Sequence, residues 1–154
     1  MTLEEFSRRI QVLEDIEAIK RLKALYVRAC DDSYNPEKIA ALFVENGVWD
    51  GGKVWGLHRG RKEIKAFFAQ VSSDITFAVH YIMAPDITIE GDRGYGTWYG
   101  LVPATLKGEA IWMSVRYDDE YVKIDGKWLA SLMKVSVFFL TSYDKGWARY
   151  RIMD

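Results

Sequence analysis

The sequence predicts an α+β domain in which three N-terminal helices pack on a strongly curved antiparallel or mixed β-sheet that encloses a pocket. Helical periodicity dominates the first part of the 154-residue chain, and β-branched and aromatic residues dominate after residue 73. Helices followed by a long strand meander are typical of the α+β class. Several predicted strands exceed the usual length of about five or six residues, so the sheet must coil beneath its helices.

The first predicted helix covers residues 3–30. Thr2 and Glu5 fit a capping box at its start, and Asp31, Asp32 and Ser33 are expected to end it. Apolar side chains recur in steps of three or four, which is typical of an amphipathic helix. This stripe consists of Leu3, Phe6, Ile10, Leu13, Ile16, Ile19, Leu22, Leu25, Tyr26 and Ala29.

A second helix is expected to follow at once. Asn35 resembles an N-cap, Pro36 a first-turn proline and Glu37 an acidic first turn. The apolar residues Leu42 and Phe43 are predicted to continue this helix.

Short strands are predicted at residues 48–49 and 54–55, with a glycine turn at 51–52 between them. The third helix is expected at about residues 60–72, where apolar side chains again have helical spacing.

Five strands are predicted in the second half of the chain, at residues 75–83, 87–90, 95–106, 109–124 and 128–140. Turn signals separate them, and Asp125 with Gly126 is a strong signal for a two-residue hairpin. No repeat or linker is visible, so residues 1–154 are interpreted as one domain.

The composition excludes several classes of function. The net charge is −1 without a basic patch, so no nucleic-acid partner is expected. No apolar run approaches the length of a membrane span, and the charged N-terminus does not resemble a signal peptide. The single cysteine, Cys30, cannot form an internal disulfide and suggests a reducing compartment, so a cytoplasmic location is expected. No nucleotide-binding motif or Cys/His cluster is present, and we expect no metal and no cofactor.

The aromatic content is high, with six Trp, nine Tyr and seven Phe. Aromatic side chains build cores, but they also line sites for apolar ligands. The residues expected to line the pocket are Trp49, Trp98, Tyr99, Trp112 and Phe138. Aromatic residues left on the outer face of a curved sheet usually need covering, so a homodimer or homotrimer is expected.

One histidine, His80, lies in the otherwise apolar run TFAVHYIM. It is either a core histidine that finds a hydrogen bond or a base placed in a dry environment. The only other histidine, His58, is expected in the turn that leads to the third helix.

Four segments carry a resemblance to a known family: DIEAIKRLKALYVRACDD, VHYIMAPDITI, GTWYG and RYDDEYVKIDGKWLAS. They resemble the SnoaL-like family of the nuclear-transport-factor-2-like (NTF2-like) superfamily, which has a cone-shaped, cystatin-like fold. Within it the chain looks most like bile-acid dehydratase, scytalone dehydratase and lindane dehydrochlorinase. The resemblance implies a His–Asp dyad in the cone and tyrosines that polarise the substrate.

Carried over by position, the resemblance assigns the dyad to His80 and Asp31, with Asp32 as the alternative carboxylate, and the polarising role to Tyr26. The expected function is that of a cofactor-independent lyase or isomerase acting on an apolar polycyclic or aromatic carbonyl compound. Two alternatives stay open: a non-catalytic module that binds a small molecule, or an accessory β-type subunit of a ring-hydroxylating dioxygenase.

Overall fold

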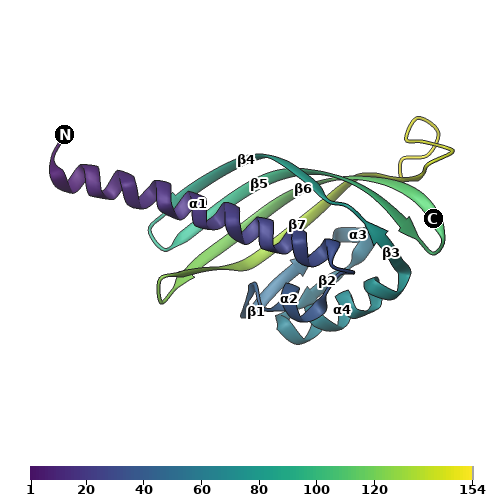
Figure 1. Ribbon diagram of the computed structural model, residues 1–154, viewed down its shortest axis with the longest axis horizontal. Coiled ribbons are helices and arrows are strands. Elements are labelled where there is room, and N and C mark those ends of the chain that lie inside the picture. Colours follow the sequence, from purple (N-terminus) through teal and green to yellow (C-terminus); the bar gives the residue numbers. More distant parts are fainter. Residues whose placement is uncertain (154) are drawn as a thin grey trace.

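The computed structural model describes residues 1–153 and confirms an α+β fold with a strongly curved sheet (Figure 1). The helices are α1 (Leu3–Asp31), α2 (Pro36–Ala40), α3 (Gly52–Trp55) and α4 (Gly60–Asp74). The strands are β1 (Phe43–Asp50), β2 (Leu57–Arg59), β3 (Ile75–Ala78), β4 (Tyr81–Glu90), β5 (Arg93–Leu106), β6 (Glu109–Ile124) and β7 (Lys127–Ser142).

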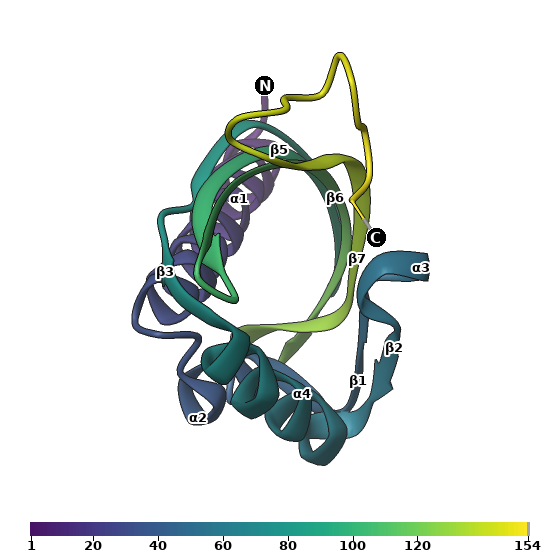
Figure 2. The ribbon, with the colours of Figure 1, turned by 90° about the vertical axis from the view of Figure 1, so that its right-hand side faces the viewer.

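The seven strands form one mixed sheet in the order β2-β1-β7-β6-β5-β3, and β4 also pairs with β5. All pairs are antiparallel except β1 with β7, which is parallel. Figure 2 shows the long strands curled into most of a barrel, with α2 and α4 at one side of it and α1 running along another. Among residues 1–153, no helix is long and apolar enough to cross a membrane.

Helix α1 starts with the predicted capping box, because Glu5 N–H donates to Thr2 Oγ1 at 3.1 Å and Thr2 N–H donates to Glu5 Oε2 at 2.7 Å. Its first turns nevertheless project beyond the sheet (Figure 1), and the helix becomes buried only from Asp15 onward. The predicted apolar stripe is therefore present along α1, but its first turns are exposed. The exposed side chains there are Leu3, Phe6, Ile10 and Leu13.

The segment between α2 and α4 differs from the prediction in two places. Helix α2 has Asn35 as its N-cap, as predicted, but it ends at Ala40, and Phe43 begins strand β1. The strand predicted at residues 54–55 is instead part of α3. Gly56, at φ +79°, ends this short helix in a conformation that favours glycine.

The strand predicted at residues 75–83 is divided into β3 and β4 by residues 79 and 80. Strand β4 then continues without a break past Pro85, where a turn was predicted. A register shift between Met83 and Asp86 explains this, because proline has no N–H to donate and is tolerated at a bulge. The division of the first strand places His80 outside the regular ladder.

A buried carboxylate joins α1 to the far end of the sheet. Asp15 accepts hydrogen bonds from Trp128 Nε1 at 2.9 Å and from Lys123 Nζ at 2.8 Å. Burial alone would raise the pKa of Asp15, but the hydrogen bonds from Lys123 and Trp128 outweigh it and hold this pKa below its usual value. Trp128 is therefore a structural residue that fixes the helix to the hairpin.

Candidate functional site

His80 is held in one orientation by two hydrogen bonds to the same oxygen. Its backbone N–H and its Nδ1 lie 3.0 Å and 2.7 Å from Asp31 Oδ1. The backbone donor is available because residue 80 lies in the gap between β3 and β4. A carboxylate only accepts hydrogen bonds, so Nδ1 carries a hydrogen, and in the neutral imidazole the lone pair is on Nε2.

Asp31 is the last residue of α1, and its side chain is 33% exposed while that of His80 is almost fully buried. The carboxylate thus approaches the imidazole from the solvent side. Asp32, the alternative, does not contact His80 but pairs with Lys38 Nζ at 2.8 Å and accepts from Asn35 at 3.1 Å. The hydrogen bond from Lys38 holds the pKa of Asp32 below its usual value.

On the other side of the imidazole lies Tyr34, a residue that the sequence analysis missed. Its hydroxyl is 3.3 Å from His80 Nε2, and its ring meets the imidazole edge-on. Burial raises the pKa of Tyr34 well above its usual value, so the hydroxyl keeps its proton and can donate to Nε2. No periodic pattern could have identified this residue, because it lies in the irregular turn after α1.

Nε2 faces a largely apolar cavity inside the curved sheet. The polar side chains in its wall are His80, Tyr26, Tyr34 and Tyr117, and the remaining lining is mostly aromatic and aliphatic. The cavity volume is about 30 Å³, counted as the space open to the centre of a water molecule. This is room for about two waters. A larger occupant requires lining side chains to move.

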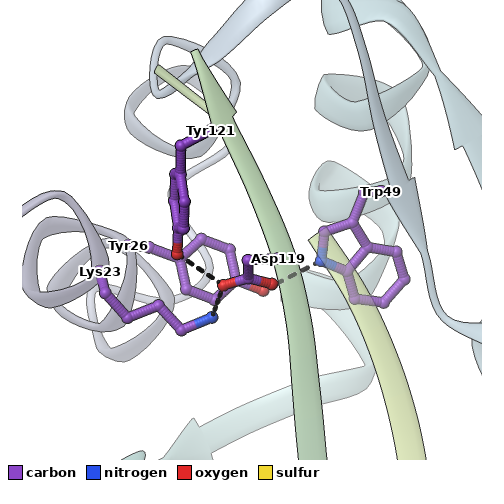
Figure 3. A network of polar contacts seen from close by, with 5 residues as sticks. All are labelled: Lys23, Tyr26, Trp49, Asp119 and Tyr121. Atoms are coloured by element: carbon purple, nitrogen blue, oxygen red, sulfur yellow. Dashed lines mark hydrogen bonds and ion pairs between the residues drawn. The ribbon is translucent and has the colours of Figure 1, made fainter. Parts of the chain in front are cut away.

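Tyr26 and Trp49 both line this cavity, and they are joined by a hydrogen bond (Figure 3). Trp49 Nε1–H donates to Tyr26 Oη at 3.0 Å. Burial raises the pKa of Tyr26 well above its usual value, so this phenol stays neutral. Because its oxygen already accepts from an indole, its own O–H is left to act as a donor.

Tyr26 and Asp31 lie on different sides of the same helix, yet both serve the same pocket. Five residues correspond to a rotation of about 140° on an ideal helix. Tyr26 lines the cavity, whereas Asp31 is not in its wall and reaches only Nδ1 of His80. The two side chains meet opposite ends of the site, and α1 need not end between them.

Four of the five predicted lining residues are not in the wall of this cavity, and these predictions are wrong: Trp98, Tyr99, Trp112 and Phe138. Tyr99 and Phe138 are 45% and 48% exposed and stack on each other on the outer face of the sheet. Side chains alternate along a strand, so the inward direction of its neighbours turns Tyr99 outward. Trp112 is half-buried between the inward-pointing Ile111 and Met113 and is not in the cavity wall.

A buried ion pair lies behind the cavity wall (Figure 3). Lys23 Nζ and the Tyr121 hydroxyl both donate to Asp119 Oδ2, at 2.8 Å and 2.7 Å, and Lys23 and Asp119 are 1% and 3% exposed. Burial lowers the pKa of Lys23 and raises that of Asp119, and their attraction opposes both changes. The signal in the sequence was a lysine at helical spacing between Ile19 and Tyr26.

This ammonium group also contacts the cavity wall through a ring. Lys23 Nζ lies 3.4 Å from the centroid of Tyr117, which is within cation–π range. Trp98, the fifth predicted lining residue, is buried but lines a groove between α1 and β4 together with Lys23 and Arg28. His80 lines both this groove and the cavity, so the imidazole forms part of the wall between them.

The other reactive groups nearby have structural roles. Burial raises the pKa of the Cys30 thiol to about 12, so the thiol is a poor nucleophile. His58 Nε2 lies 2.9 Å from the carbonyl oxygen of Trp55 and holds the end of α3. Within residues 1–153, no three His, Cys, Asp or Glu side chains are grouped in a way that could hold a metal ion.

Several solved structures are similar to this chain. A protein from Novosphingobium aromaticivorans, provisionally named an aromatic ring hydroxylase, is 25% identical with a TM-score of 0.79, over 84% of this chain and 94% of that one. A provisionally named scytalone dehydratase from the same species is 22% identical with a TM-score of 0.77, over 85% and 89%.

The hexachlorocyclohexane dehydrochlorinase LinA-type3 from Novosphingobium barchaimii is 19% identical with a TM-score of 0.77, over 84% of this chain and 90% of its own. A cystatin-like fold is also found in a similar structure from Nostoc punctiforme. The family model described as "SnoaL-like domain" matches residues 11–134. The chain therefore belongs to the SnoaL-like family and has its NTF2-like, cystatin-like fold.

Proposed function

We propose that this protein is a cofactor-independent lyase or isomerase that removes a proton next to the carbonyl group of an apolar aromatic or polycyclic compound. The observation that carries this proposal is the 2.7 Å contact between Asp31 Oδ1 and His80 Nδ1, which leaves Nε2 facing a mostly apolar cavity. An imidazole with its Nδ1–H bound to a carboxylate has the tautomer and orientation required of a general base.

In the proposed reaction, His80 Nε2 takes the proton from the carbon next to the carbonyl. The electron pair of the broken C–H bond forms an enolate, and the Tyr26 hydroxyl donates a hydrogen bond to its oxygen. Asp31 stabilises the imidazolium. The electron pair then expels a group from the β-carbon, or a proton returns at another carbon. A positioned base contributes a factor of about 10²–10⁴, and a donor in a dry site adds further stabilisation.

Relatives support the reaction class. The similar structures include a dehydrochlorinase and a provisionally named dehydratase, and both names describe eliminations. Their identity to this chain is low, so the proposal depends on the chain's own His80, Asp31 and Tyr26 rather than on their substrates. The apolar lining supports an aromatic or polycyclic substrate, and the small cavity requires that its wall widens when the substrate enters.

The alternatives have specific support. The mostly apolar cavity would also suit a protein that only binds a small apolar ligand. The similarity to a provisionally named ring hydroxylase would suit an accessory subunit of such an enzyme. Neither role needs a carboxylate on His80 Nδ1, so mutation of Asp31 separates both from the proposed enzyme.

The proposal is tested with a panel of β-hydroxy ketones of increasing size, beginning with β-hydroxy-β-phenylethyl methyl ketone. Its dehydration gives a conjugated enone that is followed by ultraviolet absorbance. We expect His80→Ala to lower turnover by about 10²–10⁴. Asp31→Asn is expected to lower turnover strongly as well, because an amide no longer holds the imidazole hydrogen on Nδ1. The hydrogen can then move to Nε2, which leaves no lone pair there to accept a proton.

Asp32→Asn is the matched control, because it removes the neighbouring carboxylate without touching His80. We expect it to keep wild-type turnover. Wild-type turnover in His80→Ala would show that His80 is not the base. Thermal stabilisation by the panel compounds without any turnover would instead identify a binding module.

A further inference from the structure

His80 and Asp31 account for removal of a proton, but neither can protonate a departing group while the imidazole acts as base. Tyr26 is committed to the carbonyl oxygen in the proposed reaction. A second proton donor close to Nε2 would protonate the departing group while the imidazole still holds the proton it has taken.

Tyr34 occupies that place. Its hydroxyl oxygen is 3.3 Å from His80 Nε2, and both groups are in the cavity wall. The ring is fixed by stacking on Phe68, with centroids 6.1 Å apart and planes 13° apart, and the residue is 5% exposed. The hydroxyl is thus held beside the base at the cavity surface.

The backbone at Tyr34 is an independent sign of a functional position. Ser33 and Tyr34 both have positive φ, 52° and 51°, although neither is glycine. The left-handed region costs an L-residue roughly 1–2 kcal/mol. Backbone hydrogen bonds from Tyr34 N–H to Cys30 O and from Asn35 N–H to Ala29 O, both 2.9 Å, maintain the turn. This turn holds the Tyr34 phenol next to His80, although glycine would adopt the same positive φ with less backbone strain.

We propose that Tyr34 is the general acid of the reaction and the cap of its base, a role that rests on the function proposed above. In the resting site its O–H donates to His80 Nε2 and occupies the lone pair. When a substrate with a β-hydroxyl group binds, the Tyr34 hydrogen turns to the hydroxyl oxygen, and Nε2 becomes free to take the proton next to the carbonyl.

The steps balance without any other reactant. The C–H bond breaks and its proton goes to Nε2, while its electron pair becomes part of the new C=C bond. The C–O bond breaks and the oxygen leaves as water with the proton of Tyr34. The imidazolium Nε2–H then returns a proton to the Tyr34 oxygen across 3.3 Å, and both residues regain their first state.

Two consequences follow from this geometry. Base and acid are adjacent, so proton and hydroxyl leave from the same face of the substrate. Nε2 becomes free only when the Tyr34 hydroxyl donates to another acceptor. A leaving oxygen accepts that hydrogen bond better than a leaving halide does, so it frees Nε2 more readily. The site is therefore built for dehydration rather than loss of a halide.

The resting hydrogen bond is tested without a substrate, by ¹⁵N NMR of protein labelled at histidine. The chain has only two histidines, so His58 serves as an internal reference. We expect Tyr34→Phe to shift the Nε2 signal of His80 and to leave that of His58 unchanged. Tyr81→Phe, an exposed tyrosine beside His80, is the matched control and should shift neither. An unchanged His80 Nε2 signal in Tyr34→Phe would overturn the proposed cap.

The acid role is tested with β-hydroxy-β-phenylethyl methyl ketone in D₂O. We expect Tyr34→Phe to lower the elimination rate by about 10²–10⁴ while deuterium exchange next to the carbonyl persists. Equal elimination in Tyr34→Phe and wild type would overturn the acid role, as would an equal loss of exchange and elimination. His80→Ala separates this proposal from the function proposed above: if that variant keeps deuterium exchange, the base itself is wrong, whatever Tyr34 does.

Discussion

The buried pair of Lys23 and Asp119 gives a prediction that needs no substrate. Replacing Lys23 with Met keeps the length of the side chain but leaves the Asp119 carboxylate buried with Tyr121 as its remaining hydrogen-bond donor. Removing one partner of a buried pair typically costs about 3–5 kcal/mol. For a domain of this size that corresponds to a fall in Tm of roughly 6–20 °C.

The assay is urea unfolding at neutral pH, followed by tryptophan fluorescence, with calorimetry for Tm. Lys20→Met is the matched control, because Lys20 lies on the same helix in an exposed pair with Glu17 and should contribute less than about 1 kcal/mol. Adding Asp119→Asn to Lys23→Met should recover much of the loss, because the uncompensated charge is gone. If Lys23→Met cost no more than Lys20→Met, the reasoning about an enclosed ion pair would be refuted.

Three further predictions concern other parts of the molecule. Trp55→Ala should open the cavity wall and speed the binding of the apolar dye anilinonaphthalene sulfonate in stopped-flow fluorescence; an unchanged rate would show that Trp55 is not a barrier. The pKa of Asp15 is lowered in the folded protein, so its carboxylate stabilises the fold fully above the unfolded pKa of about 4, and this stabilisation is lost as pH falls through the folded pKa. In urea unfolding at several pH values, Asp15→Asn should therefore lose less stability toward acid pH than wild type does. Parallel stability–pH curves for the two proteins would contradict this assignment. We propose that a second copy of the chain covers the exposed, stacked side chains of Tyr99 and Phe138. Light scattering should then find a dimer or trimer, and Tyr99→Lys should convert it to single chains. A monomeric wild type would contradict this proposal.

Much of the fold could be predicted because local signals and packing agree in it. Alternating β-branched and aromatic residues defined β6 at its observed ends, and Asp125 with Gly126 marked the β6–β7 turn. The capping box at Thr2 likewise marked the start of α1. The exposure of the first turns of α1 could not be predicted, because periodicity identifies an apolar face but not whether a surface lies opposite it.

The candidate site was partly accessible from the sequence for similar reasons. His80 was noticeable as a polar residue in an apolar run, and the resemblance pointed to Asp31. Tyr34 depends on two successive left-handed residues that no propensity favours. Trp98 and Tyr99 are adjacent in a strand, so the two residues point to opposite faces, and the burial of Trp98 excludes Tyr99 from the interior.

Deuterium incorporation is the most direct test of His80 as a base, because it detects proton removal even where no group leaves. The protein is incubated in D₂O with β-hydroxy-β-phenylethyl methyl ketone and larger aryl ketones, and the deuterium content of each compound is measured by mass spectrometry. We predict that wild type and Asp32→Asn introduce deuterium next to the carbonyl and that His80→Ala and Asp31→Asn do so far more slowly. Equal incorporation by wild type and His80→Ala would contradict this prediction.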